Sequence, residues 1–95
     1  MRDYEVMTIH NPELAEADVQ AKVEGLGAFL EERGAEVKAK DLWGKRRFAY
    51  EIDHLSEGYY SIVTFAADGE VIDSLDRMLS LADEVVRHKV VRPGA

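Results

Sequence analysis

The sequence contains no cysteine, and this absence removes several classes of protein and of site. Without thiols there is no disulfide framework, no thiolate nucleophile and no Cys-ligated zinc or iron–sulfur centre. Proline occurs only twice, and no run of about 18 apolar residues exists, so we expect no membrane-spanning helix. The opening residues Met1 to Glu5 lack the apolar core of a secretory signal. We therefore expect a cytoplasmic protein with no membrane association.

Positive charge is also scarce, since 12 Lys and Arg stand against 19 Asp and Glu and give a formal net charge of −7. Indiscriminate nucleic-acid binding normally needs a broadly positive surface, so the net negative charge argues against such binding. The cations are nevertheless concentrated in two segments. Residues 36–54 hold five cations against four anions, and residues 85–95 hold three cations and no anion. Any contact with RNA is therefore expected to be a local patch on an acidic molecule.

Apolar residues are abundant, at 46% of the chain against 33% charged, which is far from the composition of disordered proteins. A chain of 95 residues is long enough for one two-layer core and too short for a second. We therefore predict a single domain that spans residues 1–95.

Periodicity divides the first half of the chain into a strand, a helix and a long strand. Residues 4–9 are apolar at both alternate sets of positions, which is typical of a central strand. Apolar residues then recur at helical spacing: Val19, Val23, Leu26 and Leu30. Gly34 stands where a left-handed C-terminal cap is usual. Residues 36–52 alternate as one strand with an irregularity near Gly44.

The second half begins with a polar hairpin connection, predicted over residues 53–58. Residues 59–67 predict a further strand which, like the strand at residues 4–9, is apolar on both faces. Asp68 is a candidate N-cap for a helix with an apolar inner stripe: Val71, Ile72, Leu75, Met78 and Leu79. Residues 85–91 are rich in valine and predict a last strand, which Pro93-Gly94 ends.

The order strand, helix, strand, strand, helix, strand predicts an α+β protein with the ferredoxin-like split βαβ fold (βαββαβ). This fold has a four-stranded antiparallel sheet with two helices on one face. Right-handed crossovers place the first and third strands in its centre, which agrees with their two-sided hydrophobicity. The face that the helices leave uncovered is expected to meet a partner, because these strands carry apolar side chains on both sides.

A tryptophan and three consecutive cations stand out in the long strand: Trp43, Lys45, Arg46 and Arg47. Guanidinium groups bind phosphates bidentately and aromatic faces stack on bases, although a solvated strand, with Trp43 covering the core edge, would also explain this pattern. Neighbouring strand residues point to opposite faces, so the three cations cannot face one row of phosphates on an ideal strand. We predict a bulge or bend at Gly44 that re-aims them, with Phe48 or Tyr50 anchoring the segment to the core.

Several segments have the order and spacing of one known family. The opening Met-Arg-Asp-Tyr-Glu and the run Gly-Lys-Arg-Arg-Phe-Ala-Tyr-Glu-Ile at residues 44–52 carry most of the match, and residues 34–37, 58–60 and 86–92 extend it. In these features the chain resembles the bacterial small-subunit ribosomal protein S-six family. Phe48 stands where the family usually has Leu and Glu51 where Pro is frequent, and we expect both changes to alter packing more than RNA contact.

The resemblance implies a non-catalytic role in the ribosome, without a cofactor. It implies that the chain binds the central domain of small-subunit ribosomal RNA together with ribosomal protein S-eighteen. The RNA-binding positions that it suggests lie in three segments: Arg2, Tyr4, Lys45, Arg46, Arg47, Arg87 and Arg92. Trp43 is added to the predicted RNA-binding residues because its aromatic face can stack on a base. A metal site is not expected, because His10, His54 and His88 lack ligand spacing.

Other functions on the same fold leave different signatures. An acylphosphatase-type enzyme needs an Arg-containing phosphate cradle after the first strand, and residues 10–13 supply none. Base stacking on the third strand is not expected, because Glu57 and Ser61 stand where a basic and an aromatic residue would be needed. The uncovered face is therefore assigned to a protein neighbour. A small-molecule-sensing regulatory domain remains the alternative, and it would dimerise through this face without binding RNA.

Overall fold

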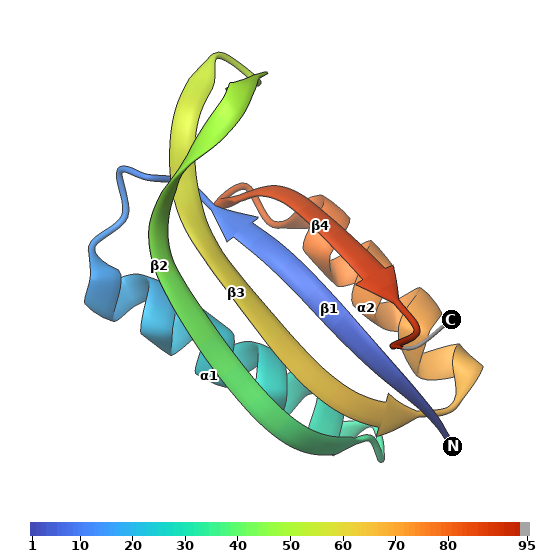
Figure 1. Cartoon of the computed structure of the whole chain (residues 1–95). Coiled ribbons are helices and arrows are strands. Elements are labelled where there is room, and N and C mark those ends of the chain that lie inside the picture. Colours follow the sequence, from blue (N-terminus) through green and yellow to red (C-terminus); the bar gives the residue numbers. More distant parts are fainter. Residues whose placement is uncertain (94–95) are drawn as a thin grey trace.

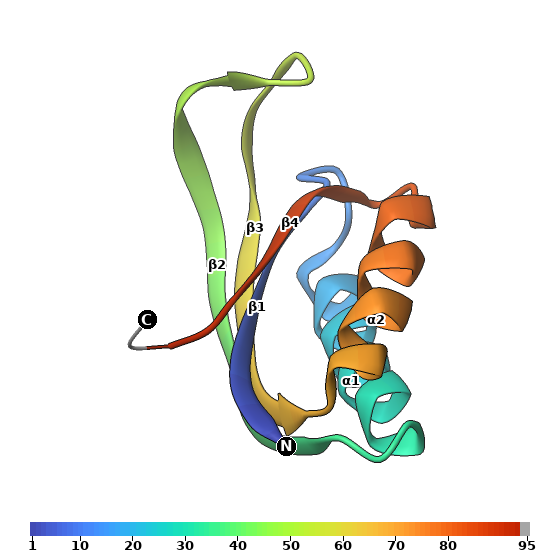
Figure 2. The same cartoon turned by 90° about the vertical axis from the view of Figure 1, so that its right-hand side faces the viewer.

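The computed structural model describes residues 1–93. Its elements follow in the order β1 (Arg2–His10), α1 (Glu16–Glu32), β2 (Glu36–Ile52), β3 (Leu55–Ala67), α2 (Gly69–Leu81) and β4 (Val85–Val91). The strands form an antiparallel sheet in the order β2-β3-β1-β4 (Figure 1). Both helices lie against the same face of this sheet (Figure 2). The predicted α+β, ferredoxin-like split βαβ fold is therefore confirmed, with β1 and β3 in the centre.

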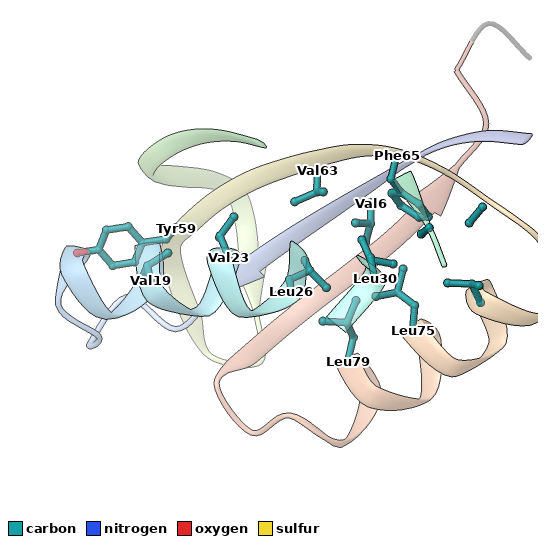
Figure 3. Close-up of a cluster of buried hydrophobic side chains, with 13 residues drawn as sticks. Val6, Val19, Val23, Leu26, Leu30, Tyr59, Val63, Phe65, Leu75 and Leu79 are labelled. Carbon is teal, nitrogen blue, oxygen red and sulfur yellow. The ribbon is translucent and has the colours of Figure 1, made fainter. Parts of the chain in front are cut away.

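The hydrophobic core fills the space between the sheet and the helices. Val6 of β1 and Val63 and Phe65 of β3 are fully buried and point toward the helix layer (Figure 3). The helices meet them with side chains at the predicted helical spacing: Val19, Val23, Leu26 and Leu30 from α1, and Val71, Leu75 and Leu79 from α2. Each large apolar side chain stabilises the fold by about 1.5–3 kcal/mol when it is fully buried.

Two buried hydroxyls pair in the middle of this core. Thr8 and Ser61 stand directly opposite each other on β1 and β3, and their side-chain oxygens lie 2.5 Å apart. Both residues are completely buried, so each hydroxyl depends on the other for a side-chain partner. A slip of one residue between β1 and β3 would separate them and turn the apolar side chains to the wrong face, so the pair helps to fix the register.

The ends of the helices agree in part with the sequence. Gly34 follows α1 with φ +86°, the left-handed conformation expected of a C-terminal cap. Asp68 occupies the N-cap position of α2, but its side chain makes no capping hydrogen bond, and the carboxylate lies 3.4 Å from the amino group of Met1. Gly94, expected with Pro93 to end the last strand, lies outside the described residues.

The connection between β2 and β3 is shorter than predicted. Ile52 pairs with Leu55, so Asp53 and His54 alone form the turn, and β3 already begins at Leu55. Both turn residues have positive φ, at 50° and 65°. Two consecutive residues of this kind give the hairpin a twist that matches its strands. The predicted loop over residues 53–58 is therefore wrong beyond His54.

The β2–β3 hairpin projects beyond the rest of the sheet. β1 ends at His10, which pairs with Tyr59, so residues 46–58 pair only within the hairpin. We call this segment the distal ribbon, and it extends away from both helices (Figures 1 and 2). Within residues 1–93, no helix combines the length and the apolar character that crossing a bilayer requires.

Candidate nucleic-acid interface

The basic run of β2 follows a bulge at the base of the distal ribbon. Leu42 pairs with Ser61 and Gly44 pairs with Tyr60, so Trp43 is the extra residue in the strand. Gly44 has φ +82°, which residues with a side chain rarely adopt. The irregularity predicted at Gly44 is therefore confirmed, and it leaves the indole of Trp43 exposed over 52% of its surface.

The three cations after the bulge point to different sides of the ribbon. Lys45 pairs with Tyr59 on the helix side of the sheet, and its Nζ lies 5.2 Å from the centroid of the Tyr59 ring. Arg46 is opposite Gly58 and therefore belongs to the other face, where its Nε donates a hydrogen bond of 3.3 Å to the Trp43 carbonyl oxygen. The alternation expected of strand residues is thus kept after the bulge, and charge is presented on both sides.

Phe48 holds this segment against the sheet. Its ring packs edge to face on Tyr60, with 6.0 Å between the ring centroids. Phe48 also closes over Gly58, where an added Cβ would lie 3.0 Å from its ring and 2.6 Å from Ile9. Tyr50 is 73% exposed and cannot serve as the anchor. Of the two aromatic anchors considered from the sequence, the structure therefore selects Phe48.

Arg87 of β4 lies in the same row of the sheet as the bulge. Gly44, Tyr60, Ile9 and Arg87 occupy paired positions on the four strands. Three strand spacings separate β2 from β4, which amounts to about 14 Å. Because Arg87 shares its face with Ile9 and Tyr60, it lies on the same side of the sheet as Arg46. The predicted residues of this region form the distal cluster: Trp43, Lys45, Arg46, Arg47 and Arg87.

The remaining predicted residues lie at the opposite end of the sheet. Arg2 and Tyr4 begin β1, and Arg92 directly follows the pairing of Val91 with Glu5. Tyr4 is half-buried and stacks on Phe65, with the ring centroids 5.8 Å apart. These residues form the terminal cluster: Arg2, Tyr4 and Arg92. Five residue steps along β1, from Tyr4 to Ile9, separate the rows of the two clusters, a distance of about 17 Å.

The distal cations differ from other cations of β2 in their partners. Lys38 binds Asp3 and Lys40 binds Glu24, each with 2.8 Å between nitrogen and oxygen. The hydrogen bond and the charge of Lys38 lower the pKa of Asp3 below its usual value. In the described part of the chain, no carboxylate pairs with a cation of the distal cluster: Lys45, Arg46, Arg47 and Arg87. Their charge is therefore available to an external anion.

Lys89 is a basic residue of this surface that the sequence analysis left out. It pairs with Met7 and is exposed two positions after Arg87, so both side chains lie on the same face of β4. The signal was present in the sequence, because strand residues two positions apart share a face. His88 between them faces the helices, and its Nε2 lies 2.6 Å from the Asp76 carboxylate of α2.

The sheet face opposite the helices has an apolar centre. Met7, Tyr60, Ile62 and Phe48 are half-buried there without any covering element in residues 1–93. Charged residues surround this apolar strip: Asp3, Lys38, Arg46, Arg87 and Lys89. We call this surface the open face. An apolar centre with a charged rim is the usual anatomy of a protein interface.

The described residues contain no group of three or more His, Asp and Glu side chains arranged to hold a metal ion.

The fold and the surface define the class of the protein: a ferredoxin-like α+β protein that displays unpaired cations on a projecting hairpin and an apolar sheet face. The sequence profile described as Ribosomal protein S6 matches residues 3–92. The chain belongs to this family, whose members are proteins of the small ribosomal subunit.

Individual relatives agree over nearly the whole length. The chain is 48% identical to the small ribosomal subunit protein bS6 of Carboxydothermus hydrogenoformans, covering 97% of this chain and 96% of that protein. It is 46% identical to the bS6 protein of Desulforamulus reducens, with 99% of each covered. The crystal structure of 30S ribosomal protein S6 from Thermotoga maritima superposes with a TM-score of 0.91 at 32% identity, covering 96% of this chain and 86% of that one.

Proposed function

We propose that this protein of the small ribosomal subunit binds the central domain of small-subunit ribosomal RNA jointly with ribosomal protein S-eighteen, in the bacterial cytoplasm. The observation that carries the proposal is the contrast within β2. Lys38 and Lys40 are held by carboxylates, whereas the cations of the distal cluster have no such partner among residues 1–93. On a chain of net charge −7, such cations mark where a polyanion can approach.

The distal cluster is the first RNA contact in this proposal. Arg46 and Arg47 bind phosphates, and Lys45 adds a point charge on the helix side of the ribbon. Trp43, with 52% of its surface exposed beside them, offers a face on which a base can stack. Arg87 extends the contact about 14 Å across the sheet, which is more than one phosphate spacing of a single strand. This width suits a folded RNA surface.

The terminal cluster is the second contact. Arg2 and Arg92 are exposed at the end of the sheet where β1 begins and β4 ends. Tyr4 stacks on Phe65 and packs against the core, so its main contribution is to hold the start of β1 in place. Two basic clusters about 17 Å apart can bind two separate RNA segments, as the fold of a junction would require.

The open face is the surface proposed for S-eighteen. Its half-buried Met7, Tyr60 and Ile62 would lose their remaining exposure against a protein neighbour, and burial of this surface favours association. Arg46 and Arg87 lie at its rim and belong to the distal cluster as well. A partner docked here would therefore lie next to the RNA contacts, which explains why the two would bind jointly.

The test is assembly of a ternary complex from purified components. We expect the chain and S-eighteen together to retain a central-domain RNA fragment in a native gel at concentrations where either protein alone retains little. Failure to form a ternary complex, with both proteins folded, would contradict the proposal. A ligand-dependent homodimer without RNA affinity would instead favour the small-molecule-sensing alternative.

A further inference from the structure

Two arginines from different helices line one shallow hollow on the surface of the helix layer. Arg33 directly follows α1, and Arg77 lies in α2. The hollow measures about 250 Å³, and its other lining residues are Phe29, Ser74, Met78 and Leu81. All of them belong to the helix layer, which lies on the other side of the sheet from the open face (Figure 2). The hollow is therefore distinct from the open face and from both basic clusters.

The two arginines differ in their partners from Lys22, the other cation of the helix layer. Lys22 pairs with Glu84, with 3.5 Å between nitrogen and oxygen. Within residues 1–93, neither Arg33 nor Arg77 forms an ion pair with a carboxylate. As in the distal cluster, their charge is therefore available to an external anion.

Phe29 orients the guanidinium group of Arg33. The Cζ atom lies 3.7 Å from the centroid of the Phe29 ring, and Nη1 donates a hydrogen bond of 3.3 Å to the Phe29 carbonyl oxygen. A guanidinium group has five N–H donors in a planar fork, so the other donors can still bind a carboxylate. An arginine that is already oriented loses less conformational freedom when it binds a ligand.

The hollow also offers apolar contact beside the cations. Leu81, the last residue of α2, is 76% exposed, which is the largest exposed fraction among the large apolar side chains of residues 1–93. Met78, one turn earlier, is half-buried beside it. An aliphatic group that packs on these two side chains would remove apolar surface from water. The hollow therefore suits a ligand that joins an anionic group to an apolar one.

The surrounding charge limits how many negative charges the ligand can carry. Four carboxylates lie close to the two arginines, either in the chain or across an adjoining hollow: Glu31, Glu32, Glu70 and Asp73. A polyanion such as RNA would meet these carboxylates as well as the two cations, and like charges repel each other. A single carboxylate between Arg33 and Arg77 avoids most of this repulsion. The surface therefore favours a protein segment over a nucleic acid.

We propose that this hollow binds a segment of a protein neighbour that carries one carboxylate and one large aliphatic side chain. Arg33 and Arg77 bind the carboxylate, and the aliphatic side chain packs on Met78 and Leu81. Hydrogen bonds between a guanidinium group and a carboxylate are directional, so the arginines also orient the segment. The site goes beyond the proposed RNA binding and does not depend on it, because it shares no residue with the basic clusters or the open face.

Two blocked dipeptides with amidated C-termini, acetyl-leucyl-glutamate and acetyl-leucyl-glutamine, test the site, because they share size and shape and differ in one carboxylate. We expect both to cause saturable NMR shifts of the Leu81 methyl groups, and the glutamate peptide to shift the side chains of Arg33 and Arg77 as well. The glutamate peptide should bind about fivefold more tightly, as expected for an exposed ion pair. No saturable shift with either peptide, or equal affinities, would overturn the proposal. A short oligouridylate that shifts the same signals at lower concentration would also overturn it, in favour of a nucleic-acid site.

Variants of equal charge loss separate the hollow from the rest of the helix layer. Arg33→Gln and Arg77→Gln should each reduce the preference for the glutamate peptide, whereas Lys22→Gln should keep it. Leu81→Ser should weaken both peptides. These four side chains are exposed, and unchanged amide spectra away from the hollow would show that the fold is intact. A preference that persists in both arginine variants or disappears in Lys22→Gln, or unchanged binding in Leu81→Ser, would contradict the assignment.

Discussion

Gly44 and Gly25 show how one residue type has opposite effects at two positions. Neither glycine has an atom within 4 Å of the place where a Cβ would be built. Gly44 has φ +82°, whereas Gly25 lies inside α1, with ordinary helical backbone. The difference between the two positions is therefore one of backbone conformation alone, since space is available at both.

Alanine substitution at these positions should change stability in opposite directions. We expect Gly44→Ala to lower the free energy of unfolding by about 1–2 kcal/mol, because a Cβ is strained at positive φ. Gly25→Ala should raise it by about 0.5–1 kcal/mol through helix propensity. Urea denaturation of both variants measures the two effects. A stability change of the same sign in both would contradict the conformational argument.

His10 should make stability depend on pH. Burial lowers its pKa in the folded chain, so the unfolded chain binds the proton more readily. The free energy of unfolding should therefore fall as the pH drops below the ordinary histidine value of 6.5. Denaturation at pH 5 and pH 7 should show this loss in the wild type and a smaller one in His10→Gln. Equal losses in both would contradict the burial argument.

The chemistry of single residues could be predicted from the sequence better than their partners. The basic run and its bulge followed from alternation and from one glycine, whereas Arg87 of β4 was suggested only by the family resemblance. The pairing of Lys38 with Asp3 spans 35 positions in the chain and becomes visible only once the sheet is assembled. The burial of His10 at the end of β1, next to residues of both helices, depends in the same way on the assembled fold.

At the scale of elements, the distal ribbon depends on few contacts for its position. No third strand among residues 1–93 pairs with it beyond the row of His10 and Tyr59, so its stability comes from the turn, from cross-strand pairs and from Phe48. An isolated two-stranded hairpin is only marginally stable in water. The packing of Phe48 on Tyr60 is therefore important for presenting the cations at its base.

Phe48 and Tyr50 offer a matched comparison of this anchoring. We expect Phe48→Ala to lower the free energy of unfolding by about 1–3 kcal/mol, because a half-buried ring is lost. Tyr50→Ala, at a position 73% exposed, should change it by less than about 0.5 kcal/mol. Hydrogen exchange of the ribbon amides should increase in Phe48→Ala alone. Similar behaviour of the two variants would refute the assignment of Phe48 as the anchor.

The elements themselves could be predicted because apolar residues recur with the period of each. Four strands, two helices and their order agree with the sequence. The predicted connection over residues 53–58 contained the turn at Asp53 and His54 but extended too far, because Ser56, Glu57 and Gly58 have the composition of a loop. No glycine or asparagine at positions 53 and 54 marked a two-residue turn. The bulge was found because Gly44 carries such a signal.

The whole molecule combines an acidic surface with two separated basic clusters. Its net charge of −7 opposes long-range attraction to RNA, so binding must rest on a few short-range contacts. The fold positions the two clusters at opposite ends of the sheet and leaves the open face between them. The sequence could not predict this separation, because it depends on which strand ends lie together.

The measurement that tests this account most directly is the salt dependence of ternary-complex formation in two double variants of equal charge loss. Arg46→Gln/Arg47→Gln removes two unpaired cations, and Lys38→Gln/Lys40→Gln removes two that carboxylates already hold. We expect the arginine variant to weaken the complex and to reduce the slope of log K against log salt by about 1–2, since fewer counterions are released. The lysine variant should keep the wild-type slope. Equal slopes in both variants would contradict the account.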